Sequence, residues 1–272
     1  MSTPLNRMLR ICFIVILSAE AFSLSAREIA FFYALDADLA AFRRTLGVTP
    51  TNETVSRQTL SHFQLEGARV TATKMGSGAV QSAISAQILL TGRPIDLAFS
   101  VGPVGGLMDS FRPSQIGVVR EVVPWQSIYW TPQAYPNSGF QALLPRNPPE
   151  GLSISNQLLT TPMIVASGEA FISDPEARSA IREVTRAQVV DMNLYGLLKV
   201  LEREEIPSLH LRIVSDSASF GASEQFAVFL ESYDGRLGAE VAKIIQNLPE
   251  DKTRPTAFPT LKALIEESLD SE

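Results

Sequence analysis

The sequence predicts an α/β protein in which helices cover both faces of a central sheet. Short runs rich in Val, Ile and Phe alternate along the chain with segments of helical periodicity, and this alternation is typical of α/β sheets. In addition, the runs 29–34 and 95–101 are apolar at consecutive positions. A strand that is apolar on both faces belongs at the centre of a sheet covered on both sides.

The expected elements follow one another from residue 28 onwards. The strands are expected over 28–34, 68–75, 95–101, 115–123, 163–167, 187–192 and 210–214. The helices are expected over 36–46, 78–90, 175–186, 194–204, 223–248 and 260–268, and we allow for a break at Gly235. Residues 125–151 hold several prolines among aromatic residues and are expected to form a long irregular loop. No linker divides residues 27–272, so we expect one domain there.

Composition excludes several classes of protein. The chain has 272 residues, of which 45% are apolar and 19% charged, and this balance argues against disorder and coiled coil. The net charge of −6 argues against a nucleic-acid binder, which normally carries a basic surface. One cysteine, Cys12, and two histidines, His62 and His210, exclude a disulfide framework, a thiolate zinc site and a multi-histidine metal site. We therefore expect no metal and no cofactor.

The first 26 residues have the layout of a secretory signal peptide. Arg7 and Arg10 supply positive charge, an apolar run follows over 11–17, and small residues lead up to Ala26. The apolar run is too short for a stable membrane anchor. We expect cleavage after Ala26 and a periplasmic or secreted product that is not bound to the membrane. The alternative is a misassigned start codon that adds an unstructured leader.

Polar residues and glycines follow the ends of the expected strands, in chain order. They are Asp36 and Asp38, Gly76-Ser77-Gly78, the run 102–106, the run 167–172, Asp191-Met192-Asn193 and Ser215-Asp216-Ser217. Ligands of open α/β sheets bind beyond the carboxyl ends of the strands. These residues are therefore expected to meet at one edge of the sheet and to form the site.

This ordered set resembles the purine nucleoside phosphorylase and uridine phosphorylase superfamily, most closely its methylthioadenosine/S-adenosylhomocysteine nucleosidase branch. The matching segments are IAFFYALDADL, MGSGAVQSAISAQILL, IDLAFSVGPVGGL, IVASGEAFISDPEAR, VVDMN and IVSDSAS. The resemblance implies a three-layer αβα domain with a mixed, twisted sheet. It also implies an enzyme that cleaves the N-glycosidic bond of a purine nucleoside, commonly as a homodimer.

Asp216 matches the aspartic acid that protonates the purine in this family, and Ser215 would orient it. A purine leaves more easily once it is protonated, and such a donor needs a pKa raised by burial. The alternative is that Asp216 only caps the following turn.

Asp38 falls where the nucleosidase branch has its water-activating glutamate, one methylene longer. The shorter side chain has less reach, and Asp36 two residues earlier is a substitute. The alternative is that both aspartates only favour the first turn of the helix 36–46 through its dipole.

Asn193 stands where the family usually has a glutamate that accepts hydrogen bonds from both ribose hydroxyls. An amide offers one acceptor oxygen in place of two, so the resemblance implies weaker or altered sugar binding. Met192 would pack against the sugar, or else belong to the core. Phe171 and Ile172 match the pair that holds the purine, although Phe171 could also be a core residue.

Gly76 and Gly78 allow close approach of a ligand and open the next helix with free N–H groups. Gly78 and Met75 complete the expected substrate-binding set. Met75 replaces a common Ser or Thr, which favours water over phosphate as the nucleophile. His62 and His210 are expected to be structural or surface residues, and Trp125, Tyr129 and Trp130 begin the long loop.

We therefore expect an exported nucleosidase. Two alternatives stay open: a phosphate-dependent phosphorylase, and a nucleoside-binding protein of the same fold that has lost turnover. Asn193 and the short Asp38 are the residues that favour the second.

Overall fold

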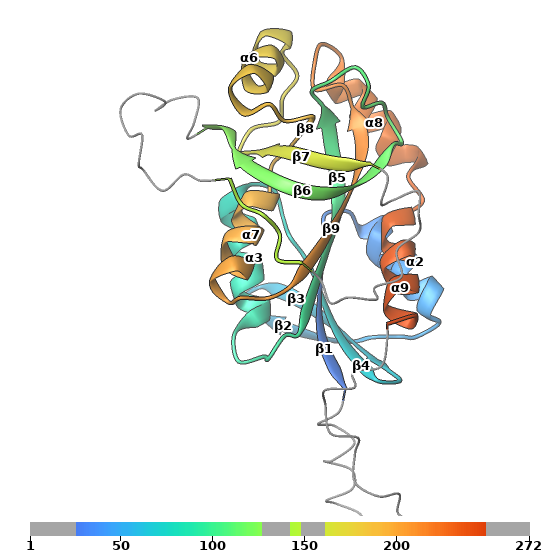
Figure 1. Ribbon diagram of the computed structural model, residues 1–272. Helices are drawn as coiled ribbons and strands as arrows, with labels where there is room; N and C mark the ends of the chain where they lie inside the picture. The colour runs from blue at the N-terminus through green and yellow to red at the C-terminus, as the bar shows by residue number, and fades with distance from the viewer. Residues whose placement is uncertain (1–25, 127–141, 148–160, 249–272) are drawn as a thin grey trace, which may run out of the picture.

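The computed structural model describes residues 26–126, 142–147 and 161–248 (Figure 1). The expected signal peptide up to residue 25 and the expected helix 260–268 lie outside these residues. So does most of the loop 125–151, with Tyr129 and Trp130. Within the described part, no helix is long and apolar enough to cross a membrane.

Strands and helices alternate through the described residues. In chain order they are β1 (Arg27–Tyr33), α2 (Asp36–Leu46), β2 (Thr51–Val55), β3 (Gln58–Leu65), β4 (Ala68–Lys74), α3 (Ala79–Leu90), β5 (Leu97–Gly106), β6 (Ile116–Pro124), β7 (Pro162–Ser167), α6 (Pro175–Thr185), β8 (Val189–Asp191), α7 (Leu194–Arg203), β9 (Ser208–Asp216), α8 (Ala222–Ser232) and α9 (Arg236–Gln246).

The strands form one mixed sheet in the order β2-β3-β4-β1-β5-β8-β7-β6-β9. The pairs of β1 with β4 and β5, and of β5 with β9, are parallel, whereas β5–β8 and β6–β9 are antiparallel. Strand β9 pairs with β5 as well as with β6, so β5, β8, β7, β6 and β9 close into a ring. A closed ring leaves no free edge on these strands.

Helices cover both faces of the sheet, which confirms the expected αβα class. Helices α2 and α9 lie on one side and α3 and α7 on the other (Figure 1). Strand β1 shows why both faces are buried. Ile29 and Phe31 belong to the apolar cluster under α2 and α9, while Ala30 and Phe32 belong to the cluster under α3 and α7. Successive side chains of a strand point to opposite faces, so an uninterrupted apolar run supplies both clusters.

The break allowed for at Gly235 is present, and it separates α8 from α9. Gly235 has φ +79°, a left-handed conformation that favours glycine. A Cβ at Gly235 would lie 2.0 Å from the carbonyl oxygen of Ala37, and a Cβ at Gly238 would lie 2.0 Å from that of Asp38. The backbones of α2 and α9 therefore touch, and this contact fixes the surroundings of Asp38.

The hairpin β2–β3 was not predicted from the sequence. Strand β2 is polar and mostly exposed at the edge of the sheet, so it has no apolar run that would indicate a strand. The turn uses Ser56 and Arg57 with positive φ, without the usual Asn-Gly or Asp-Gly signal.

Strand β5 also continues past the expected end at residue 101, through Gly102 and Pro103 to Gly106. Glycine and proline usually mark strand ends. Here, however, a Cβ at Gly105 would lie 2.9 Å from Oδ1 of Asp216, so glycine lets β5 pass beside the site.

Replacement of Gly238 by Ala should destabilise the protein. Helix propensity alone predicts the opposite, a gain of about 1 kcal/mol, because Ala favours helices more than Gly does. The contact with the carbonyl of Asp38 should reverse that sign and cost about 1–3 kcal/mol of unfolding free energy. Urea denaturation of both proteins measures the difference. A more stable Gly238→Ala protein would show that α2 and α9 are not in backbone contact.

Candidate active site

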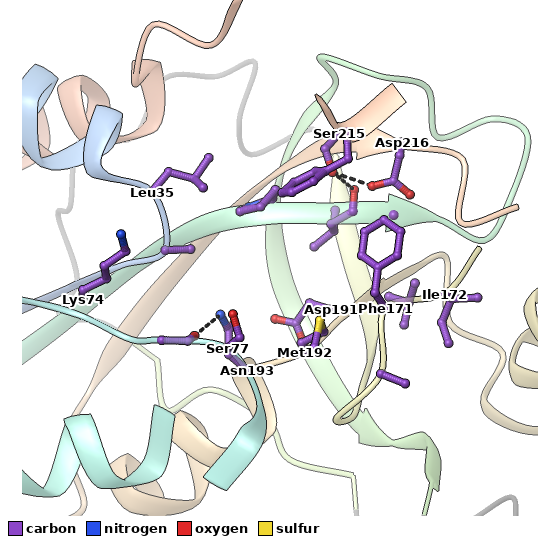
Figure 2. Close-up of a pocket in the computed structure, with 18 residues that line it drawn as sticks. Leu35, Lys74, Ser77, Phe171, Ile172, Asp191, Met192, Asn193, Ser215 and Asp216 are labelled. Carbon is purple, nitrogen blue, oxygen red and sulfur yellow. Dashed lines mark hydrogen bonds between the residues drawn. The ribbon is translucent and has the colours of Figure 1, made fainter. Parts of the chain in front are cut away.

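A pocket of about 210 Å³, partly open to solvent, lies where several strands end. Its lining comes from the segments that follow β1, β4 and β7, from β5, from the ends of β8 and β9, and from Phe226 of α8. The expected convergence of strand ends is therefore present. Figure 2 shows Phe171 and Asp216 on one side of this pocket and Asn193 with Ser77 on the other.

Asp216 ends β9 and is 2% exposed. Its Oδ1 accepts a hydrogen bond of 2.9 Å from the N–H of Ala218, and its Oδ2 accepts one of 2.7 Å from the hydroxyl of Ser215. Ser215 Oγ also lies 3.2 Å from the carbonyl oxygen of Val104. Burial raises the pKa of Asp216, against the smaller lowering effects of these hydrogen bonds. A carboxyl group with a raised pKa, next to a pocket, can act as a proton donor.

Phe171 and Ile172 follow β7 and line the same pocket. Ile172 is buried, whereas Phe171 is 41% exposed, so its ring is available to a ligand. The ring centroids of Phe171 and Phe226 are 5.8 Å apart. Such a pair of aromatic rings from two elements forms an apolar surface suited to a flat ring system.

Asn193 is the N-cap of α7, and Met192 beside it also lines the pocket. The Nδ2 of Asn193 donates to the carbonyl oxygen of Gly76 at 3.4 Å, as the dashed line in Figure 2 shows. The hydroxyl of Ser82 donates to the Asn193 main-chain carbonyl at 2.6 Å. The amide thus uses one of its two N–H donors on the glycine loop, which leaves Oδ1 as its acceptor for a ligand.

The expectation that Gly76 and Gly78 open α3 with free N–H groups is wrong for Val80, whose N–H is engaged. It donates to Oε1 of Glu169 at 3.0 Å. A Cβ at Gly78 would lie 2.2 Å from Oε2 of the same carboxylate. Glycine at position 78 therefore makes room for Glu169, and this side chain ties the loop that carries Phe171 to the N-terminus of α3.

Met75 and Gly78, two of the predicted binding residues, are not among the residues that line the pocket. Met75 is completely buried in the apolar cluster under α3 and α7. Lys74, the neighbour of Met75, lines the pocket instead and forms an ion pair of 2.7 Å with Asp36. Adjacent side chains at a strand end point to opposite sides, so Met75 faces the core.

Asp38 is completely buried and also stands outside the pocket lining, one turn of α2 beyond Leu35, which does line it. Its Oδ1 accepts hydrogen bonds from the hydroxyl of Tyr233 at 2.6 Å and from the N–H of Gly238 at 3.2 Å. In the described part of the chain, Oδ2 has no hydrogen-bond partner. Burial raises the pKa of Asp38 to about 6.

Sequence reasoning missed Arg212, a completely buried residue of β9. Its Nη1 donates to the hydroxyl of Ser100 at 3.2 Å, and its Nε lies 3.6 Å from Oδ2 of Asp191, a pocket residue. Nε and Nη2 make no hydrogen bond within the described residues. The available signal was an arginine between the apolar residues Leu211 and Ile213.

Of the two histidines, His210 is buried and structural. It lies between the hydroxyls of Ser100 and Ser208, at 2.7 and 2.8 Å. Burial and the charge of Arg212 lower its pKa well below the usual value, so it is neutral. His62 is a partly exposed residue of β3 that contacts Thr71. In the described part of the chain, no group of three or more His, Cys, Asp or Glu residues could hold a metal ion.

The fold and the site define an α/β protein with a pocket at the ends of its strands, lined by a buried carboxyl group. The family model described as the phosphorylase superfamily matches residues 28–248. The chain belongs to this superfamily, which confirms the resemblance found in the sequence.

Similar proteins of known name include two nucleosidases and a hydrolase. The 5′-methylthioadenosine/S-adenosylhomocysteine nucleosidase of Bacillus thuringiensis (strain Al Hakam) is 25% identical over 231 residues, which cover 81% of this chain and 99% of the relative. The nucleosidase of the same name from Helicobacter pylori superimposes with a TM-score of 0.72 at 18% identity, covering 82% of this chain and 100% of that one. Futalosine hydrolase of Helicobacter pylori gives a TM-score of 0.69 at 18% identity, with 82% and 97% covered. These two structures confirm the fold.

Proposed function

We propose that the protein hydrolyses the N-glycosidic bond of a purine nucleoside, with Asp216 as the acid that protonates the leaving base. The observation that carries this proposal is a carboxyl group with a raised pKa, 2% exposed, in the lining of a pocket that also holds an exposed aromatic ring. The named relatives are nucleosidases, which supports the same reaction class.

The contacts of Asp216 suit proton transfer. The purine would lie against Phe171, with a ring nitrogen toward Asp216, since both side chains lie on the same side of the pocket (Figure 2). Ser215 Oγ contacts both Asp216 and the carbonyl of Val104. Its hydroxyl can therefore stabilise the carboxylate that remains once the proton has left.

Water is the nucleophile in this proposal, and three features of the site support it over phosphate. The carboxylate of Glu169 occupies the N-terminus of α3, where an anion would otherwise bind. Met75, which stands where Ser or Thr is common in the family, is buried in the core. Among the described residues that line the pocket, Lys74 is the one cation, and Asp36 neutralises it. Asp38 is the proposed acceptor of the proton from water.

The proposed substrates are nucleosides of the methylthioadenosine and S-adenosylhomocysteine type, as the names of the relatives suggest. Asn193 favours a second candidate, a nucleoside-binding protein with little turnover, because its side chain brings one acceptor and no charge to the sugar.

We also propose a homodimer. Helix α3 has no charged residue and exposes Val80 and Ile84, which supports self-association.

The decisive experiment incubates the protein with a panel of purine nucleosides, with and without phosphate, and follows release of the free base. Asp216→Asn should lower the rate of release by about 10²–10⁴-fold, because an amide of the same shape cannot donate the proton. Asp174→Asn, at the N-terminus of α6 and outside the pocket lining, is the matched control. Strict dependence on phosphate would identify a phosphorylase, and full activity of Asp216→Asn would refute the assigned acid.

Asn193→Glu should lower KM for the nucleoside by about tenfold or more. Glutamate restores two charged acceptors for the ribose diol, and a hydrogen bond to a charged group contributes about 1.5–3 kcal/mol. A gain present in both ground and transition state appears mainly in KM. Asn193→Gln has the length of glutamate without its charge, so steady-state kinetics of the two variants separate reach from charge. Equal KM values for them would contradict this account of Asn193.

We further propose that the protein is exported and processed after Ala26, on the basis of the order of basic, apolar and small residues in its N-terminus. N-terminal sequencing of protein isolated from the periplasm or the medium should begin at Arg27. An intact Met1 on a cytoplasmic product would contradict export.

A further inference from the structure

The carboxylate of Asp38 is fixed through one of its two oxygens. Oδ1 accepts from the hydroxyl of Tyr233 and from the N–H of Gly238, at 2.6 and 3.2 Å. The hydroxyl of Tyr233 in turn accepts from the N–H of Leu237 at 3.3 Å. Asp38 and Tyr233 together therefore satisfy the second and third N–H groups of α9, which would otherwise lack acceptors.

The second carboxylate oxygen of Asp38 takes no part in this capping. Oδ2 is buried and has no hydrogen-bond partner within the described residues, and the same holds for Nε and Nη2 of Arg212. The charge of Arg212 acts on Asp38 and favours its ionised form. Capping of α9 needs Oδ1 alone, so it does not explain a second buried oxygen without a partner. Such an atom in a folded protein calls for a functional explanation.

We propose that Tyr233 is a positioning residue, whose hydroxyl anchors Oδ1 of Asp38 and leaves Oδ2 as the oxygen that takes a proton from the attacking water. Asp38 is buried one turn of α2 beyond the pocket residue Leu35, so the proposal requires that this water lies between the pocket and Oδ2. This inference rests on the proposed hydrolytic function. In the step, a proton passes from water to Oδ2 and the water oxygen bonds to the anomeric carbon of the sugar. The N-glycosidic bond breaks, and its electron pair leaves with the base, which receives its proton from Asp216.

The groups around Asp38 determine when it can accept that proton. Burial raises its pKa to about 6, while the hydrogen bonds from Tyr233 and Gly238 and the charge of Arg212 act in the lowering direction. Asp234, between α8 and α9, acts in the raising direction. Loss of the Tyr233 hydroxyl should therefore raise the pKa of Asp38 further. Because only the carboxylate can accept a proton, the acidic limb of the activity profile should move to higher pH.

The test compares Tyr233→Phe with the parent protein across pH 4.5–8.5. The loss of one hydrogen bond to a charged group corresponds to a shift of about 1 pH unit. We therefore expect kcat/KM for base release to fall about tenfold at pH 5 and to change little at pH 8. Tyr195→Phe, in α7 on the other face of the sheet, is the matched control and should leave the profile unchanged. Equal loss at every pH would show that Tyr233 is only structural and would overturn the inference.

A second readout does not depend on turnover. The carboxyl carbon of Asp38, assigned by comparison with Asp38→Asn, is titrated by ¹³C NMR in the parent and in Tyr233→Phe. Its midpoint should rise in the variant together with the acidic limb of kcat/KM. A rise of the midpoint without a change in the limb would overturn the catalytic part of the inference. If the parent protein released no base from any nucleoside, the proposed function itself would be contradicted. That result is distinct from a failure of the inference about Tyr233, because it is seen without any variant.

Discussion

The charge of Arg212 is buried without access to solvent, and the polar interior of the protein depends on it. Removing an ion from water costs several kcal/mol unless carboxylates and hydrogen bonds compensate. Here the compensation comes from separate parts of the chain: Asp191 at the end of β8, Asp38 in α2 and Ser100 in β5. One cation thus makes the positions of α2, β5 and β8 interdependent. Asp191, which lines the pocket, is held both by this charge and by the N–H of Leu194, which donates to its carboxylate.

Two buried carboxyl groups with raised pKa values, in different surroundings, can serve opposite roles. Asp216 has a hydroxyl and an N–H as its partners and no cation among the causes of its pKa shift, which suits a group that keeps its proton. Asp38 is under the influence of Arg212, which favours the ionised form. Local charge that makes the pKa values of two carboxyl groups differ is a common way for a site to provide both a general acid and a general base near neutral pH.

Much of the site could be predicted from the sequence, since strand ends are visible in it. Asp216, Phe171 and Asn193 all follow apolar runs, and the topology of an α/β sheet brings such positions together. The helix 36–46 was predicted with its observed bounds, because acidic residues mark its first turn and a glycine its end.

The remaining features depend on contacts between distant segments. The role of Glu169 requires the N-terminus of α3, 89 residues away, and the hydrogen bond from Tyr233 to Asp38 joins residues 195 apart. Arg212 was missed for the same reason, because its partners are not its neighbours in sequence. Strand β2 was missed because an edge strand needs no apolar face.

The closed ring of β5, β8, β7, β6 and β9 divides the molecule into two parts with different tolerance to change. Every strand of the ring has at least two neighbours, so lengthening one would shift the register of the others and move the residues that line the pocket. The hairpin β2–β3 forms the open edge of the sheet, and its outer strand β2 is mostly exposed to solvent. Insertions and deletions among relatives should therefore occur mainly at this hairpin, whereas the ring should keep its dimensions. The hairpin is likewise the place where an inserted peptide should be tolerated best.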